Sequence, residues 1–290
     1  VIGRKIADYC IENDMVLPSL KRIFLAGAPS PPSLIEKLSQ ILVKGKVIVP
    51  YGATEALPVS FATAEQIKKS QESILIGQGS CLGIPVPGVS VKIFPSMAPA
   101  LSARLPENGE LAQGKVGEIC VAGDIVTQGY YRMPGATVDA RFSYDNQTFH
   151  RMGDLGYFDQ ENSLRFLGRK AECVKTKYGP LETERCEPMI NAMPGVKKSA
   201  LIGIGDTMGQ EPCIVVEPAN DNPSIEEKKV LSKTILQILH SSFPKMKFKR
   251  VFWESAIPVD ARHNAKIHRL SLSKKWHRLV NEKNQTGIWA

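Results

Sequence analysis

Two apolar segments of strand length, separated by a helical segment, constrain the fold of this chain most. Arg22–Ala26 and Lys46–Val49 have the composition of buried strands, and Leu34–Leu42 between them has the spacing of a helix. A strand, a helix and a second strand in this order form a βαβ unit, whose strands are expected to run parallel. The first part of the chain is therefore predicted to be an α/β layer.

The pattern changes twice further along the chain. Between residues 77 and 169, short strand-like segments alternate with glycine and proline turns, which is typical of a small antiparallel sheet or barrel. Later segments alternate between helices and strands, as in a compact α+β unit. The expected fold class is α/β plus α+β: the remainder of an α/β subdomain over 1–76, a β-rich, barrel-like subdomain over 77–169 and a small α+β C-terminal domain over 170–290.

The individual elements expected after residue 77 follow from apolar periodicity. Strands are predicted at 89–94, 118–122, 164–167, 198–204, 213–217 and 250–253, and helices at 182–192, 225–239 and 270–281.

Charge is distributed unevenly. The net charge is +8, and residues 225–290 alone carry 14 Lys and Arg against 5 Asp and Glu. A basic segment can attract nucleic acid or another anion, and a binding or scaffolding role is the alternative to an enzyme here. Its basic residues are not interleaved with aromatic side chains that would stack on bases, so we expect no nucleic-acid partner.

The chain gives no signal for a membrane span, a disulfide framework or a zinc site. No apolar run approaches the roughly 18 residues that a transmembrane helix needs. The six cysteines include no CxxC pair. We therefore expect a protein that is not transmembrane and that works in a reducing cytoplasm.

The first candidate site is the segment Tyr51–Glu55, which follows the predicted strand at 46–49. Ligands of open α/β sheets bind at the carboxyl ends of strands. An aromatic ring, a glycine turn, a hydroxyl and a carboxylate could stack a base, approach a phosphate and hold Mg²⁺. An ordinary polar turn after a strand would carry the same residue types.

The second and third candidate sites lie further along the chain. Asp154, in a Gly-Asp turn, could accept hydrogen bonds from two vicinal sugar hydroxyls, and Arg169 could brace the same sugar or a phosphate. Lys266 precedes the last predicted helix, where a lysine is ordinarily solvated. His263 and His268 are five residues apart, which fits no metal-ligand spacing, so they are assigned no metal.

The common nucleotide fingerprints are absent. Gly77–Gly83 is one residue too long for GxGxxG, and no GxxxxGK[ST] occurs. Neither a Rossmann nor a P-loop site is therefore expected.

Taken together and in this order, the candidate segments resemble the later half of the adenylate-forming superfamily, which includes acyl-CoA synthetases, luciferases and peptide-synthetase adenylation domains. The resemblance covers essentially the whole chain. The matching segments are the adenine-side loop Leu25–Pro29, the YGxTE motif Tyr51–Glu55, the GE and GY motifs Gly117-Glu118 and Gly129-Tyr130-Tyr131, the motifs Gly153-Asp154 and Gly168-Arg169, and the lysine Lys266 before the last helix.

The resemblance implies ATP and Mg²⁺ as cofactors and assigns roles to matching residues. The nucleotide would be bound by Gly27, Ala28, Pro29, Tyr51, Gly52, Asp154 and Arg169, with Tyr51 stacked on adenine and Asp154 on the ribose hydroxyls. Thr54 would contact the α-phosphate and Glu55 would hold Mg²⁺. Lys266, on the mobile C-terminal lid domain, would bridge the substrate carboxylate and the phosphate. Such chemistry depends mostly on positioning and charge neutralisation.

Within the superfamily, residues 51–56, 168–172 and 260–267 resemble the β-lactone synthetases of bacterial olefin biosynthesis. This implies adenylation of a long-chain 3-hydroxy fatty acid, after which its own hydroxyl closes onto the acyl-adenylate, and association with other enzymes of the pathway. The alternative is a long-chain fatty acyl-CoA or acyl-carrier ligase, for which CoA would be a further cofactor. Residues 176–180 depart from the pantetheine-tunnel pattern of CoA ligases, which favours the lactone.

Four further features qualify the resemblance. Lys170-Ala171 replaces the usual hinge acid, and Met152 replaces the usual threonine before Gly-Asp. The phosphate loop of the superfamily occurs nowhere in the chain, and the sequence opens without a methionine. We therefore expect a piece of a longer enzyme that is inactive on its own.

Overall fold

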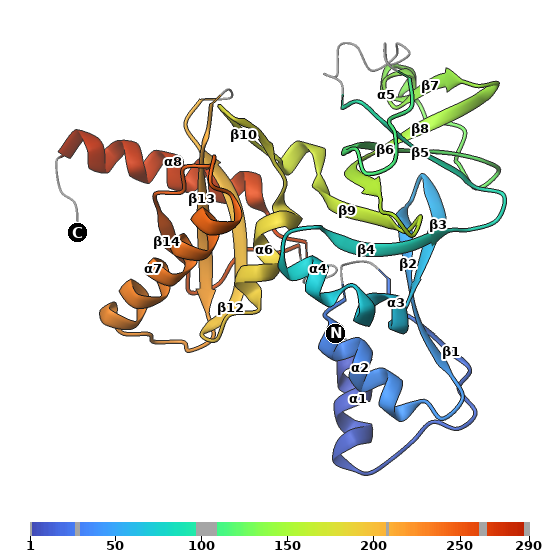
Figure 1. Cartoon of the computed structure of the whole chain (residues 1–290), viewed down its shortest axis with the longest axis horizontal. Coiled ribbons are helices and arrows are strands. Elements are labelled where there is room, and N and C mark those ends of the chain that lie inside the picture. Colours follow the sequence, from blue (N-terminus) through green and yellow to red (C-terminus); the bar gives the residue numbers. More distant parts are fainter. Residues whose placement is uncertain (1, 27–29, 97–108, 207–208, 261–265, 287–290) are drawn as a thin grey trace. The chain divides into compact units, whose positions relative to one another are not determined.

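The computed structural model describes residues 2–26, 30–96, 109–206, 209–260 and 266–286. They form two compact units (Figure 1). Unit 1 comprises residues 1–72 and 79–170, and unit 2 comprises residues 73–78 and 171–290. Each is described by itself.

Unit 1 is built on one nine-stranded sheet among the described residues. Its order is β1-β2-β3-β4-β9-β8-β6-β5, with β7 paired to β8. The strands are β1 (Arg22–Phe24), β2 (Lys46–Ala53), β3 (Ala56–Thr63), β4 (Ser80–Pro85), β5 (Ser90–Phe94), β6 (Gly117–Ala122), β7 (Arg141–Tyr144), β8 (Gln147–Phe158) and β9 (Leu164–Arg169). β1 and β2 run parallel, as the βαβ pattern predicts, and the other pairs are antiparallel.

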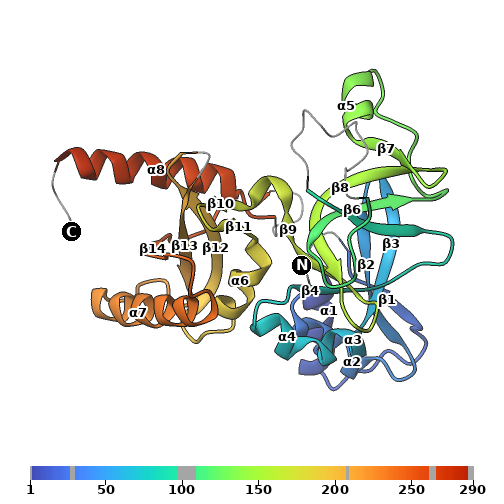
Figure 2. The same cartoon turned by 45° about the horizontal axis from the view of Figure 1, so that its top comes forward.

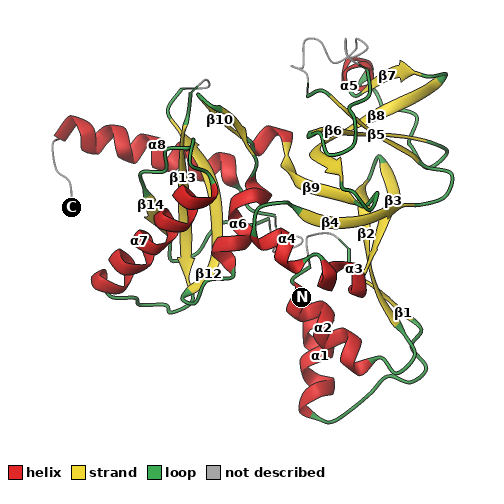
Figure 3. Cartoon of the chain, viewed as in Figure 1, coloured by secondary structure: helices red, strands yellow, loops and turns green. Residues whose placement is uncertain are grey.

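Helices cover the β1–β2 end of this sheet (Figure 3). The helices of unit 1 are α1 (Ile2–Glu12), α2 (Pro32–Ile41), α3 (Ala64–Lys69) and α5 (Pro134–Asp139), and α4 (Gln71–Leu75) runs into unit 2. α2 begins with a proline, whose fixed φ suits the first helical turn. Ala7, Leu38 and Val47 are buried together, so α1, α2 and β2 share one core.

Unit 2 is a small α+β unit around a three-stranded sheet of order β12-β13-β14 (Figure 2). β12 (Val196–Ile204) pairs antiparallel with β13 (Glu211–Pro218), which pairs parallel with β14 (Val251–Trp253). The remaining elements are the hairpin β10 (Val174–Thr176) and β11 (Gly179–Leu181), the helices α6 (Thr183–Asn191), α7 (Ile225–Ser242) and α8 (Arg269–Thr286), and the short 3-10 helix η2 (Lys170–Glu172) at the boundary.

Both faces of this sheet are buried. Leu201 of β12 faces a core with α6 and α7, whereas its neighbour Ile202 faces a core with α8. This alternation follows from the two-residue period of a strand. Together, the mixed layers of the two units confirm the predicted fold class of α/β plus α+β.

Candidate functional site

Three side chains from separate strands of unit 1 meet at the carboxylate of Asp154. The Tyr51 hydroxyl donates to Asp154 Oδ2 at 2.6 Å, and Arg169 Nε lies 3.1 Å from Asp154 Oδ1. Arg169 also donates from Nη1 to the Met152 carbonyl oxygen at 3.2 Å. Sequence reasoning names all three as site residues, and they lie together although Tyr51 and Asp154 are 103 residues apart.

The register of β8 and β9 explains why Asp154 and Arg169 lie together. Asp154 and Arg169 are direct partners in the antiparallel β8–β9 pair, so their side chains share one face. Gly153, just before Asp154, has φ +68°, a conformation that side chains rarely adopt.

The electrostatics of this cluster favour a neutral Tyr51. Burial raises the pKa of Tyr51 well above 10.0, and the nearby Asp154 carboxylate raises it further, while Arg169 acts in the opposite direction. Asp154 itself is only 3% exposed. A carboxylate oxygen has two lone pairs, so Asp154 can still accept hydrogen bonds from a ligand.

The turn between β2 and β3 carries the other residues of the YGxTE segment. Ala53 and Ala56 pair across the hairpin, which leaves Thr54 and Glu55 as its two turn residues. Thr54 is exposed and Glu55 is half-buried. A Cβ at Gly52 would lie 2.5 Å from the Ala56 carbonyl oxygen, so the turn requires glycine there.

Glu55 has a partner that sequence reasoning did not assign. Tyr130 donates its hydroxyl to Glu55 Oε1 at 2.8 Å. Burial raises the pKa of Tyr130, and the hydrogen bond to Glu55 raises it further. The GY motif singled out Tyr130, but nothing in the sequence paired it with a residue 75 positions away.

Glu55 fits Mg²⁺ as a single carboxylate ligand. Within the described ranges, no group of three or more His, Cys, Asp or Glu residues could hold a metal ion. Magnesium is commonly bound through one or two protein carboxylates together with substrate phosphates and water, so one carboxylate suffices.

A second cluster is centred on the buried Glu118 of β6. Glu118, 2% exposed, accepts from Arg151 Nη1 at 3.2 Å and from Lys170 Nζ at 2.9 Å. Glu118 belongs to the GE motif, and Lys170 is one of the two residues that replace the usual hinge acid. The cluster therefore anchors the last residue of unit 1.

Lys266 belongs to unit 2, where its backbone is held and its side chain is exposed. The Lys266 N–H donates to Asp260 Oδ1 at 3.1 Å, and the Asp260 N–H donates to the Lys266 carbonyl at 2.9 Å. Val259 and Ile267 form an antiparallel bridge beside them. Gly27, Ala28 and Pro29, which were expected beside adenine, lie outside the described residues.

Arg269, three residues after Lys266, ties the start of α8 to two other segments. Its Nε and Nη2 donate to Glu187 of α6 at 2.8 and 2.6 Å, and its Nη1 donates to Glu172 at 2.7 Å. Sequence reasoning missed this arginine because the spacing of charges does not reveal which of them become buried.

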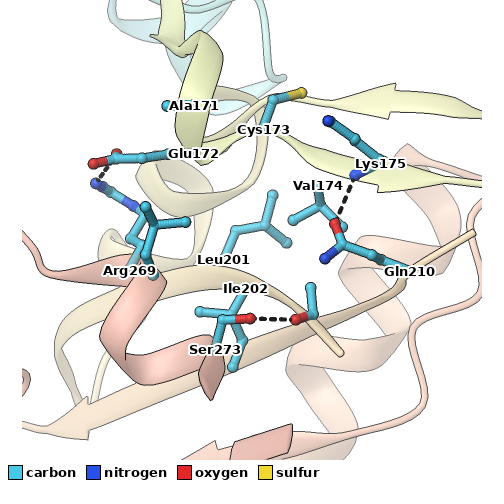
Figure 4. A pocket seen from close by; sticks show the side chains of 12 residues that line it. Ala171, Glu172, Cys173, Val174, Lys175, Leu201, Ile202, Gln210, Arg269 and Ser273 are labelled. Carbon is cyan, nitrogen blue, oxygen red and sulfur yellow. Dashed lines mark hydrogen bonds and ion pairs between the residues drawn. The ribbon is translucent and has the colours of Figure 1, made fainter. Parts of the chain in front are cut away.

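A cavity of about 160 Å³ lies beside Arg269 in unit 2 (Figure 4). The Lys175 N–H donates to Gln210 Oε1 at 3.0 Å, and the Ser273 hydroxyl donates to the Gly203 carbonyl. Several of its polar groups are thus already paired within the protein, so the cavity adds no residue to the candidate site.

Several known proteins are similar to this chain in sequence. Residues 5–131 match the family described as AMP-binding enzyme. An olefin β-lactone synthetase of Stenotrophomonas maltophilia is 35% identical over 89% of this chain and 47% of its own length. A second, from Xanthomonas campestris pv. campestris, is 36% identical over 93% of this chain and 49% of its own length.

More distant relatives share the architecture. A 4-coumarate–CoA ligase of Nicotiana tabacum is 29% identical over 91% of this chain and 44% of its own length. The solved amide bond synthetase McbA of Marinactinospora thermotolerans superposes with a TM-score of 0.73 at 21% identity, covering 94% of this chain and 50% of that one. ATP-bound MatB of Rhodopseudomonas palustris gives 0.69 at 23% identity, covering 96% and 54%. These two structures show the fold alone.

The chain spans about half the length of the relatives it matches. Among the residues that the structure describes, no helix is long and apolar enough to cross a membrane.

Proposed function

We propose that this chain, whose residues 5–131 match the family described as AMP-binding enzyme, is part of an ATP-dependent enzyme that activates a carboxylic acid as its acyl-adenylate. The observation that carries the proposal is the cluster of Tyr51, Asp154 and Arg169. It gathers an aromatic residue, a buried carboxylate and a guanidinium from three strands, the groups that a nucleoside phosphate requires.

Each residue has a defined task in the proposed first step. Asp154 accepts hydrogen bonds from the ribose hydroxyls, while Arg169 holds its carboxylate in place. Thr54 contacts the α-phosphate, and Glu55 would hold Mg²⁺, which neutralises phosphate charge when bound. The substrate carboxylate oxygen attacks the α-phosphorus, the bond to pyrophosphate breaks, and the Lys266 ammonium stabilises the charge that develops between them.

For the second step we propose an intramolecular closure. The 3-hydroxyl oxygen of a long-chain 3-hydroxy fatty acid attacks the acyl carbonyl carbon, the hydroxyl proton is lost, and the bond to AMP breaks to leave a β-lactone. An attached nucleophile benefits from its high effective concentration. The support for this substrate is the identity of 35% and 36% to two olefin β-lactone synthetases.

A fatty acyl-CoA or acyl-carrier ligase is the second candidate. It shares the first step, and the 29% identity to a 4-coumarate–CoA ligase favours it. In that case the thiol of CoA or of a carrier protein, rather than the internal hydroxyl, attacks the acyl-adenylate. A cytoplasmic location and association with enzymes of the same pathway complete the proposal.

Pyrophosphate release by the full-length protein that carries this chain tests these proposals. We expect release with ATP, Mg²⁺ and a long-chain 3-hydroxy acid, no requirement for CoA, and a lactone product detected by mass spectrometry. The matched acid without the hydroxyl should stop at the acyl-adenylate.

Two results would contradict the proposals separately. Turnover that needs CoA and ignores the 3-hydroxyl would replace the lactone with a thioester. No pyrophosphate release with any long-chain acid would reject adenylation itself. As a control for the site, Lys266→Ala should lose adenylation while its circular dichroism spectrum stays unchanged, because the Lys266 side chain is exposed.

A further inference from the structure

The carboxylate of Glu55 is held at only one of its two oxygens. Oε1 accepts the hydrogen bond from the Tyr130 hydroxyl at 2.8 Å. Among the described residues, Oε2 accepts none. One oxygen is therefore fixed by the protein, and the other is available to a cation.

Tyr130 is itself held in place at its backbone N–H and at its ring. Its N–H donates to the Thr137 hydroxyl at 2.9 Å, and that hydroxyl donates to the Met133 carbonyl at 3.0 Å. The Tyr130 ring meets the ring of buried His150 edge-on, with centroids 6.5 Å apart. The phenol is thus anchored through both its backbone and its ring.

The segment that carries Tyr130 is also joined to the turn that carries Glu55. The Thr127 N–H donates to the Glu55 carbonyl at 2.8 Å, and Val126 forms an antiparallel bridge with Ala56. Both contacts are made by residues that precede Tyr130 by three or four positions. The distance between the two segments is therefore set by the backbone, and the Tyr130 hydroxyl determines how the Glu55 carboxylate is turned.

We propose that Tyr130 is the positioning residue for Glu55, orienting its carboxylate so that Oε2 binds the cation that accompanies ATP. This inference rests on the proposed function. Hydrogen-bonded partners of a ligating carboxylate fix its orientation, and their loss commonly weakens metal binding by about 10- to 100-fold. The hydroxyl itself does not touch the cation.

The test is Tyr130→Phe in the full-length protein, with Tyr131→Phe as the matched control. Tyr131 is the next residue, is 83% exposed, and makes no hydrogen bond through its hydroxyl among the described residues. Mn²⁺ serves as the probe, because the loss of its free electron paramagnetic resonance signal reports binding in the presence of ATP. We expect Y130F to weaken Mn²⁺ binding about tenfold and Y131F to leave it unchanged, with equal thermal midpoints for both.

A kinetic readout separates positioning from a general loss of structure. Y130F should raise the Mn²⁺ concentration required for half-maximal pyrophosphate release, with the same KM for the acid. In a Glu55→Asp background, whose shorter side chain cannot reach the same geometry, Y130F should add little further loss. Additive losses would overturn the proposal even if Y130F were less stable.

Other outcomes are equally decisive. Unchanged Mn²⁺ binding by Y130F would overturn the positioning role. Tighter binding would also overturn it, because the hydroxyl would then be competing with the cation for Glu55. A wild-type protein that binds Mn²⁺·ATP but releases no pyrophosphate would reject adenylation while leaving the positioning role supported by the binding data.

Discussion

At the scale of single residues, the carboxylate of Asp154 joins three strands, because it accepts from the Tyr51 hydroxyl and pairs with Arg169. The motifs placed Tyr51 in one candidate site and Asp154 with Arg169 in another. They did not show that the Tyr51 hydroxyl donates to Asp154, because the two residues meet only once β2 and β8 are placed in one sheet. The resemblance implied that Tyr51 faces adenine, and that role stays a prediction.

His150 gives the first prediction. It is 4% exposed, and its Nδ1 has no hydrogen-bond partner among the described residues. Burial lowers the pKa of its imidazole below 6.5, and the positive charge of Arg141 lowers this pKa further. His150 is therefore protonated near pH 6.5 in the unfolded chain, whereas in the folded chain it is protonated only at a lower pH. The free energy of unfolding should fall as the pH drops below 6.5, until the lowered pKa is reached.

Urea unfolding followed by far-UV circular dichroism at pH 7.5 and 5.5 measures this effect. His150 can account for a slope of up to about 1.4 kcal/mol per pH unit. His150→Gln should reduce the pH dependence, whereas His268→Gln, at an exposed position, should not. Equal pH dependence in the wild type and H150Q would show that His150 is protonated as easily in the folded state.

At the scale of elements, the helices of unit 2 could be predicted, whereas the longest strand of unit 1 could not. The turn expected at Gly153-Asp154 is wrong, because both residues lie inside β8, where Asp154 pairs with Arg169 of β9. The helices expected at 182–192, 225–239 and 270–281 correspond to α6, α7 and α8 within a few residues, and the strand pair expected at 198–204 and 213–217 is β12–β13. Their apolar periodicity extends over enough residues to be distinctive.

The missed elements lack such a signal. β3 contains a proline and no clean alternation, and the β10–β11 hairpin has strands of three residues. β2 continues to Ala53, so the motif expected as a turn after a strand is partly strand. These segments become strands because neighbouring strands pair with them, which is a tertiary effect.

Arg269 gives a prediction at this scale, because it joins η2, α6 and α8. Arg269→Met keeps the side-chain length but leaves the buried carboxylate of Glu187 and the partly buried carboxylate of Glu172 without their cation. Removing one partner of a buried ion pair typically costs about 3–5 kcal/mol. We expect a loss of that size in the free energy of unfolding of unit 2, measured by tryptophan fluorescence of Trp253 and Trp276.

The control lies on the same helix. Arg278 is 73% exposed and is 3.6 Å from Glu282, so Arg278→Met should change stability by less than about 1 kcal/mol. If both variants lose the same amount, the network around Arg269 contributes nothing beyond an ordinary surface pair.

At the scale of the whole molecule, the two units have separate hydrophobic cores. The buried residues around β12 and β13 all belong to unit 2, and those around α1, α2 and β2 all belong to unit 1. Units with their own cores can unfold in separate transitions.

The distribution of tryptophan makes this testable. All three tryptophans lie after residue 171, so their fluorescence reports on the residues of unit 2, whereas far-UV circular dichroism reports on both units. We expect the two urea curves not to coincide. Superimposable curves would mean that the chain unfolds as one cooperative unit.

Residues 73–78 belong to unit 2, although the residues on both sides of them belong to unit 1. The polypeptide passes from one unit to the other at 72–73, again at 78–79 and finally at 170–171. A Cβ at Gly77 would lie within 4 Å of the Arg185 carbonyl oxygen and of the side chains of Phe243 and Met189, so this segment lies close to α6 within unit 2. A protease that cuts only at 170–171 would sever one of three covalent connections, and the released segment would still hold residues 73–78 against α6. Because the chain crosses between the units three times, cleavage of one peptide bond cannot release either unit whole.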